Sequence, residues 1–242
     1  MARPTLVTFT VVVAAWSLAA APVQPRHYPL ESAEGLQLHN VTAAPAGLHG
    51  KKGLQITASE EALRKVQVAP PGEPGQVSCL ARIGGLEFTN GAIEAEIAGA
   101  PAPGATEGAR GFVGIAFRLQ NDLKTYDAFY LRPTNGRADD QERRNHAVQY
   151  ISHPDWPWFR LRKEFPSKYE SYVDLMPGVW TKIKIDVHGD RARLFVHEQD
   201  QPTLIVNDLK TGAQGSGGVA LWIERGTVAH FRDLRVSPTS GQ

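Results

Sequence analysis

From Gly53 onward, hydrophobic and polar residues alternate in short runs that are separated by turn residues. Almost no window shows hydrophobic residues at the 3.6-residue spacing of a helix over three turns. A period of two places the hydrophobic set of a strand on one face of a sheet, where it can be buried. We therefore expect an all-β domain. The clearest alternating sets are Ile93, Ala95 and Ile97; Val113, Ile115, Phe117 and Leu119; and Val219, Leu221 and Ile223.

The strongest hairpin signal lies between residues 183 and 196. Residues 183–187 and 192–196 both alternate, and the turn between them contains Gly189, which can adopt a positive φ. We expect these two strands to be adjacent and antiparallel. About ten to thirteen such strands, with no helix-forming stretch between them, predict two packed antiparallel sheets in a jelly-roll β-sandwich. A closed barrel is the structural alternative.

The first 21 residues have the organisation of an export signal. Arg3 supplies the positive charge, residues 6–18 are mostly hydrophobic, and residues 19–21 are three alanines that suit signal cleavage. A membrane span needs about 20 hydrophobic residues, and this run is shorter and interrupted by Thr8 and Ser17. We predict a cleaved signal peptide over residues 1–21, a periplasmic or secreted protein, and no membrane span after cleavage.

The remaining chain divides into three parts by composition. Residues 22–50 are rich in Pro and Ala, and we expect a leader that can add one edge strand around Leu36 and Leu38. The sandwich is expected over residues 51–237, followed by a tail over 238–242. Within the sandwich, the Pro-, Gly- and Ala-rich residues 98–111 should join two strands over the surface.

Charge and cysteine content exclude some classes of partner and cross-link. The 242 residues include 26 Lys and Arg against 25 Asp and Glu, so no overall positive field exists to attract nucleic acid. Cys79 is the one cysteine, which excludes an internal disulfide. We expect Cys79 to be a small buried residue.

Planar and polar side chains are concentrated in residues 126–174. In the strand expected at its start, alternation places Tyr130 and Arg132 on the face opposite Phe129 and Leu131. A sugar presents hydrophobic CH patches and rings of hydroxyls, so its site needs flat aromatic surfaces beside hydrogen-bonding groups. We predict that carbohydrate binds to Tyr130, Arg132, Asn135, Arg137, Asp139, Arg144, Gln149, Trp156, Trp158 and Arg160.

Two structural interpretations of the same residues remain open. Residues 135–145 can form a solvated turn whose acids and arginines pair with one another, as mixed charge runs usually do. Trp156 and Trp158 can pack at the rim of the sandwich, because tryptophan is ordinarily a packing residue.

The segment YLRPTNGRADDQERRNHAVQYISHPDWPWFRLRKE, at residues 130–164, carries a resemblance to a known family, together with YESYVDLMPGVWTKIKIDV and QPTLIVNDLKTG. It resembles exported bacterial proteins with the concanavalin A-like lectin/glucanase sandwich, akin to the 3-keto-disaccharide hydrolase domain. The likeness runs from Gly53 to Val236 and is most specific over residues 132–140. It implies the jelly-roll fold and a carbohydrate-related role, although lectins, glucanases and adhesion modules share that fold.

The resemblance does not extend to a catalytic motif. Glucanases of this fold carry Glu-x-Asp-x-x-Glu on a strand, and the nearest match here is Glu94-Ala-Glu96, which we expect to face solvent on the outer sheet. A glycoside or 3-keto-glycoside hydrolase would need a pair of carboxylates, for which Asp139, Asp140 and Glu164 are the candidates. A structural cell-envelope protein with an internal ion-pair network is the third possibility.

No cofactor or metal is predicted. The histidines show no zinc-like spacing, and neither a nucleophilic serine motif nor a phosphate or dinucleotide loop is present. Calcium at Asp139 and Asp140 stays open, because two adjacent acids are a weak signal.

Overall fold

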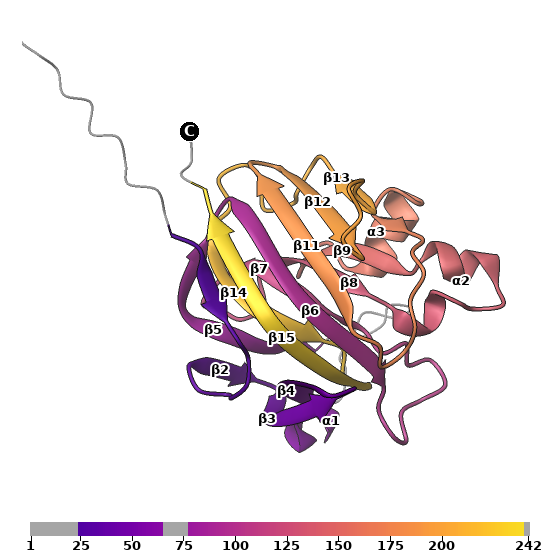
Figure 1. Ribbon diagram of the computed structural model, residues 1–242. Coiled ribbons are helices and arrows are strands. Elements are labelled where there is room, and N and C mark those ends of the chain that lie inside the picture. Colours follow the sequence, from indigo (N-terminus) through magenta and orange to yellow (C-terminus); the bar gives the residue numbers. More distant parts are fainter. Residues whose placement is uncertain (1–23, 65–76, 240–242) are drawn as a thin grey trace, which may run out of the picture.

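The computed structural model describes residues 24–64 and 77–239. These residues form two antiparallel sheets that pack face to face (Figure 1). The predicted two-sheet antiparallel sandwich is therefore confirmed. The signal peptide predicted over residues 1–21 lies outside the described residues. Within the described ranges, the chain contains no helix of the length and hydrophobicity needed to cross a membrane.

The first sheet, sheet A, has eight strands and faces the viewer in Figure 1. Its hydrogen-bonded order is β13-β12-β11-β6-β15-β4-β3, and β1 also pairs with β15. The strands are β1 (Arg26–Tyr28), β3 (Val41–Leu48), β4 (Lys51–Ala58), β6 (Gly91–Pro101), β11 (Thr181–His188), β12 (Arg191–Val196), β13 (Leu204–Val206) and β15 (Thr227–Pro238).

The second sheet, sheet B, has seven strands and lies behind sheet A in the same view. Its order is β10-β9-β8-β7-β14-β5-β2. The strands are β2 (Leu36–His39), β5 (Cys79–Phe88), β7 (Val113–Leu119), β8 (Tyr126–Leu131), β9 (Val148–His153), β10 (Glu170–Ser171) and β14 (Gly217–Ile223).

The core lies between the sheets and consists of the residues that the alternation selected. Ile93, Ala95 and Ile97 of β6 are at most 2% exposed, and Cys79 of β5 is fully buried, as predicted. The predicted hairpin is also confirmed, because β11 and β12 pair from Ile183 opposite Val196 to His188 opposite Arg191. A period of two therefore identifies the residues of these strands that face the other sheet.

The segment expected to be a leader contributes more than one edge strand. It contains β1, β2 and β3, which join both sheets. The β3 strand pairs with β4 along its whole length, because His49 and Gly50 adopt positive φ angles of 49° and 75° and close a tight turn. The two sheets therefore include strands from Arg26 onward.

Short helices interrupt the strands, although the sequence pattern predicted none. They are α1 (Glu60–Arg64), the 3-10 turn η1 (Pro133–Asn135), α2 (Gln141–Asn145) and α3 (Trp158–Glu164). The longest has seven residues, which is under two turns, so no hydrophobic repeat of 3.6 residues can develop along it.

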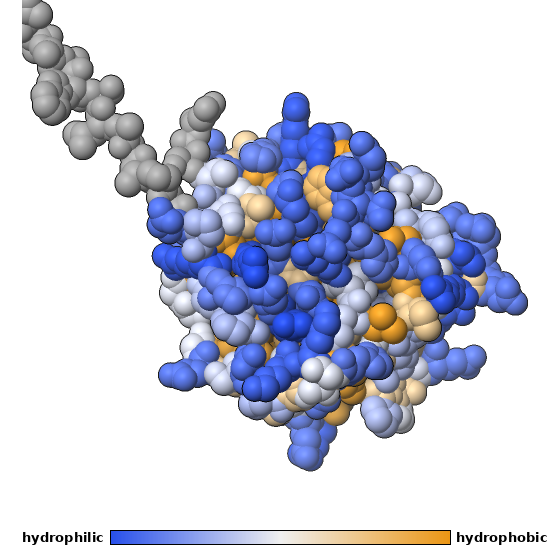
Figure 2. Space-filling model, viewed as in Figure 1, coloured by the Kyte–Doolittle hydropathy of each residue, from blue (hydrophilic) through white to orange (hydrophobic). Residues whose placement is uncertain are grey.

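The outward faces of the two sheets differ. On sheet A, Glu94 and Glu96 lie on the outer face beside Lys and Arg side chains, as predicted, and Figure 2 shows that this face is predominantly hydrophilic. On sheet B, every residue of β7, β8 and β14 is buried. Other parts of the chain must therefore cover the outer face of sheet B.

Candidate functional site

A pocket of about 540 Å³ opens on the outer face of sheet B. Its floor comes from β8, β9 and β14, and its rim comes from α1, α3, the loop between β6 and β7, and the turn between β14 and β15. The volume lies within the range of about 300–1,000 Å³ that is typical of small-ligand sites. The lining residues are Leu63, Val77, Gly104, Ala105, Thr106, Gly108, Ala109, Phe112, Tyr126, Tyr130, Ile151, His153, Trp158, Trp222, Glu224, Arg225 and Gly226.

Two stacked rings occupy the base of the pocket. In the sheet register, Gly114 lies between Trp222 on β14 and Tyr130 on β8. A Cβ atom at position 114 would lie 2.2 Å from the carbonyl oxygen of Phe129, so only glycine permits this close approach of β7 and β8. Because Gly114 has no side chain, the rings of Tyr130 and Trp222 meet above it with centroids 4.7 Å apart and planes 27° apart. The two rings pack face against face and line the base of the pocket.

A second stacked pair of rings, from β8 and β9, also lines the pocket. The rings of Tyr126 and His153 stack with centroids 5.0 Å apart, and the indole Nε1 of Trp222 donates a hydrogen bond of 3.1 Å to the Tyr126 hydroxyl. Burial raises the pKa of Tyr126 to about 12 and lowers the pKa of His153 to about 4. Both rings are therefore neutral at pH 7.

Arg132 fixes the other side of Tyr130. Its guanidinium is buried and lies 5.1 Å from the centroid of the Tyr130 ring. Its Nη2 donates to the Tyr130 hydroxyl at 2.9 Å and to Oε1 of Gln149 at 3.0 Å, and its Nη1 donates to the carbonyl of His146 at 3.0 Å. These contacts use the planar donor fork of arginine to lock the tyrosine in place.

A buried carboxylate, that of Glu170, balances this guanidinium. Arg162 donates to both oxygens of Glu170, from Nε at 2.9 Å and from Nη2 at 2.7 Å. Nη1 of Arg132 lies 3.6 Å from the same carboxylate, and Nε2 of His146 lies 3.4 Å from it. One buried carboxylate therefore offsets part of the charge of two guanidinium groups.

The structure brings four of the ten predicted ligand-binding residues together. Tyr130 and Trp158 line the pocket, and Arg132 and Gln149 lie directly beside Tyr130. Asn135 is buried next to this group, where its Nδ2 donates to the carbonyl of His146 at 3.2 Å. The predicted platform on the outer face of β8 thus exists, and its role in binding stays a prediction.

The other five predicted binding residues lie elsewhere. Arg137 forms an exposed bidentate pair with Asp174, with both N–O distances 2.7 Å. None of these five side chains lines the pocket; Arg144 lies on α2, Arg160 lies on α3, and the other three lie in the connections before these helices. They are Arg137, Asp139, Arg144, which packs on Tyr172, and Trp156, which lies under Arg160.

The three candidate catalytic carboxylates are not gathered at the pocket. Asp139 and Asp140 are exposed, and Asp140 caps α2 by accepting a hydrogen bond of 2.7 Å from the backbone N–H of Arg143. Glu164 ends α3 and pairs with Arg160 one turn earlier. Among the described residues that line the pocket, Glu224 carries the single carboxylate.

Sequence reasoning missed several residues of the pocket. Trp222 lies on the outward face of β14, opposite the inward set of Val219, Leu221 and Ile223. A tryptophan at an outward position of a strand is a usable signal, because such a ring needs cover or a ligand. Phe112 and Glu224 come from connections between strands, and their meeting depends on loop conformation that no alternation encodes.

The described residues contain no cluster of three or more His, Cys, Asp or Glu side chains that could hold a metal ion. Asp139 and Asp140, the residues considered for calcium, are both exposed at the start of α2.

Comparison with known proteins gives matches in structure and none in sequence. No family model matches the chain, and no curated protein matches it. The carbohydrate binding module CBM66 from Bacillus subtilis superposes with a TM-score of 0.50 at 12% identity, over 83% of this chain and 97% of the module. A Crh5 transglycosylase in complex with NAG superposes with a TM-score of 0.51 at 12% identity, over 90% of this chain and 86% of the enzyme. At this identity the likeness shows the fold, and the chain is an antiparallel two-sheet sandwich similar to those of these two proteins.

Proposed function

We propose that this protein binds carbohydrate and that a sugar ring lies in the pocket on the outer face of sheet B. One observation carries the proposal: four aromatic side chains, those of Tyr130, Trp222, Phe112 and Trp158, line one concave site. Sugar rings stack on such surfaces through their CH faces. The similarity in fold to a carbohydrate binding module supports the proposal at the level of architecture only.

The charge of the site favours a neutral sugar over a uronate. Arg132 is not among the lining residues and already donates three hydrogen bonds, to the Tyr130 hydroxyl, Gln149 and the carbonyl of His146. With Arg225, the described lining carries no net formal charge that would select an acidic sugar, and its one carboxylate is that of Glu224. Its Oε2 accepts from the backbone N–H of Gly226 at 2.9 Å, which leaves Oε1 to accept hydrogen bonds from ligand hydroxyls.

The same carboxylate count favours binding over glycoside hydrolysis. Retaining and inverting glycosidases use two carboxyl groups on opposite sides of the glycosidic bond. The described lining of the pocket supplies Glu224 and no second acid. His153 cannot replace it as a proton donor at pH 7, because burial lowers the pKa of its ring to about 4.

A glycan array probed with the purified protein tests this proposal. We expect binding to neutral oligosaccharides, weaker binding to uronate-containing ones, and no release of reducing sugar. Glu224→Gln should weaken binding about tenfold, because one good hydrogen-bond acceptor is worth about 1–2 kcal/mol. Lys182→Gln, on the exposed outer face of sheet A, is the matched control and should bind as the wild type does.

Two outcomes would overturn the proposal. Absence of binding to every glycan on the array would favour the structural cell-envelope role. Turnover that is lost in Glu224→Gln would replace a binding module with an enzyme. The export predicted from residues 1–21 belongs to the same proposal, since it would place the pocket outside the cytoplasm, where polysaccharides occur.

A further inference from the structure

An ion pair connects α3, which forms part of the pocket wall, to the edge of sheet B. Trp158 lines the pocket from α3, a helix that spans only seven residues and is inserted between β9 and β10. A helix this short gains little stability from its own hydrogen bonds. Its place over sheet B must therefore be fixed by tertiary contacts.

The burial of Leu161 is one of those contacts, and the ion pair with Glu170 is another. Glu170 lies on β10, at the edge of sheet B, opposite Gln149 in the register. Its side chain is only 3% exposed, and its two oxygens accept the bidentate pair from Arg162 of α3 at 2.9 and 2.7 Å. A buried bidentate pair of this kind constrains both distance and orientation. Arg162, and with it α3, is thereby bound to the edge of the sheet.

The geometry of α3 transmits this constraint to Trp158. Trp158 and Arg162 are four residues apart, so they lie on the same side of the helix, and the Arg162 guanidinium lies 4.8 Å from the centroid of an indole ring of Trp158. The guanidinium of Arg132 lies 5.8 Å from the same ring. The indole that lines the pocket is therefore in contact with two guanidinium groups.

Glu170 also keeps those two cations together. Arg132 and Arg162 both approach its Oε2, at 3.6 and 2.7 Å. Without the carboxylate, two guanidinium groups would face each other in a poorly solvated region, and one partner would be left as a buried uncompensated charge. The mobile side of such a cluster is the short helix, because Arg132 is anchored by Tyr130 and Gln149.

We propose that Glu170 is a positioning residue of the glycan pocket, which holds the Trp158 ring in the pocket wall by binding Arg162 and Arg132 at once. It does not itself line the pocket. For its effect on affinity, this inference rests on the proposed glycan site. Its effect on Trp158 does not depend on any ligand.

The ligand-independent test is acrylamide quenching of Trp158 fluorescence, obtained as the difference between each protein and its Trp158→Phe version. In Glu170→Gln we expect the quenching constant of Trp158 to rise at least about twofold, because the indole leaves the wall. Glu164→Gln removes an acid from the same helix, but from an exposed pair with Arg160, and serves as the control with unchanged quenching. Unchanged quenching in Glu170→Gln as well would overturn the inference.

The ligand-dependent test is a double-mutant cycle with a glycan found on the array. Glu170→Gln and Trp158→Leu should each weaken binding about tenfold, and together no more than either alone, since one acts through the other. Additive losses would show that Glu170 does not act through Trp158. If the wild type binds no glycan, the proposed function fails while the quenching result still decides the role of Glu170.

A milder variant covers loss of folding in Glu170→Gln. Arg162→Lys keeps the positive charge and loses the bidentate geometry, so the fold should survive while the position of Trp158 relaxes. We expect a rise in Trp158 quenching for Arg162→Lys that is smaller than that for Glu170→Gln. Quenching equal to that of the wild type would contradict the proposal.

Discussion

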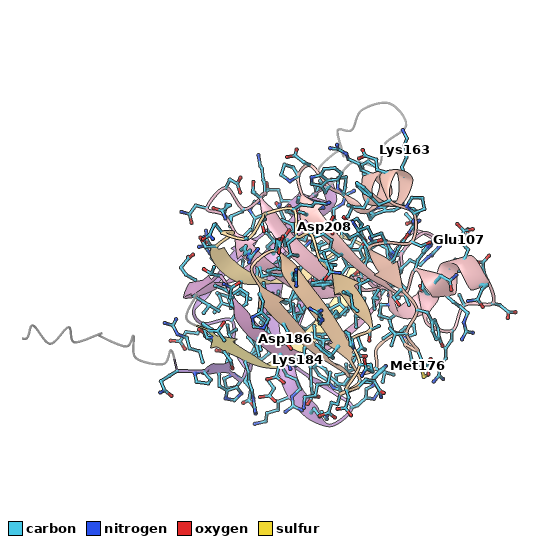
Figure 3. All side chains as sticks on the ribbon, turned by 90° about the horizontal axis from the view of Figure 1, so that it is seen from above. Glu107, Lys163, Met176, Lys184, Asp186 and Asp208 are labelled. Carbon is cyan, nitrogen blue, oxygen red and sulfur yellow. The ribbon has the colours of Figure 1, made fainter. Side chains whose placement is uncertain are left out.

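The outer faces of the two sheets follow the same alternation and carry different chemistry. On sheet A, Lys182 lies opposite Glu96 and Lys184 lies opposite Glu94 in the strand register, and these side chains meet solvent. On sheet B, the corresponding row runs through Trp222, Gly114 and Tyr130, which are buried. Figure 3 shows the separation of the two sides, with Lys184 and Asp186 on one side of the sandwich and Lys163 of α3 on the other.

This contrast shows how a site can be recognised on a sandwich of this kind. Exposed ion pairs contribute about 0–1 kcal/mol each and tolerate replacement. The aromatic row on sheet B depends on loops that cover it, on Gly114 between the rings and on the buried carboxylate of Glu170. Each of these features restricts which residues the sequence can carry there. The covered outer face is therefore where ligand recognition is expected.

The largest expected effect is from Trp222→Ala. The indole forms half of the aromatic floor and donates to the Tyr126 hydroxyl, so its removal should weaken glycan binding at least about 30-fold, as loss of a central aromatic anchor does. Titration calorimetry measures this loss. Trp180→Ala is the control: Trp180 donates to the carbonyl of Leu48 on the side of sheet A, and its loss should change affinity less than about twofold. Equal losses of affinity in both variants would contradict the assignment of glycan binding to the outer face of sheet B.

Gly114→Ala should lower the free energy of unfolding by about 2–3 kcal/mol, because the new Cβ would lie 2.2 Å from the carbonyl oxygen of Phe129. Gly47→Ala, in β3, is the matched change, since its Cβ would meet nothing closer than the Lys51 oxygen at 4.0 Å. Denaturant unfolding of both variants compares the two positions. A Gly114→Ala protein as stable as Gly47→Ala would refute the close packing proposed for the floor.

Acid should destabilise the protein through the pocket. Burial lowers the pKa of His153 from 6.5 to about 4, so between these pH values the unfolded chain binds a proton that the folded protein does not. Stability is complete above pH 6.5 and falls toward pH 4, by about 2 kcal/mol once partial solvent contact is allowed for. The free energy of unfolding, measured by denaturant at several pH values in this range, should depend less on pH in His153→Phe than in the wild type. Some slope remains in that variant, because burial also lowers the pKa of His146 and His230.

The smallest effect is expected on the charged face. Lys184→Gln removes an ion pair with Asp186 that measures 3.0 Å and is partly exposed. Stability should change by less than about 0.5 kcal/mol and glycan affinity by less than about twofold. A loss of affinity above tenfold in calorimetry would move the binding site to sheet A.

The fold was predictable because its rules are local. Alternation selected the inward-facing residues of β6, β7 and β14, and the turn at Gly189 selected the hairpin of β11 and β12. The strands before Lys51 were underestimated because Pro and Ala dilute their pattern, although Pro45 lies in an edge strand where it costs no ladder hydrogen bond.

The site was predictable in part, for a physical reason. Tyr130 and Arg132 share a strand face, so alternation placed them correctly, and Gln149 joins them through a neighbouring strand. Whether a loop residue points into a pocket depends on contacts across the fold. The ion pairs of Glu170 with Arg162 and Arg132 are such contacts, and so is the exposed ion pair between Arg137 and Asp174, away from the pocket.

Indole N–H chemical shifts during a glycan titration test the central claim most directly. The chain has five tryptophans, of which Trp16 lies in the predicted signal peptide, so four indole resonances report on the mature protein. Trp222 and Trp158 line the pocket, and Trp180 lies on the opposite side as an internal reference. We predict saturable shifts for Trp222 and Trp158 with Trp180 unchanged. Saturable shifts at Trp180 while Trp222 and Trp158 stay unchanged would contradict the assignment of the site to the outer face of sheet B.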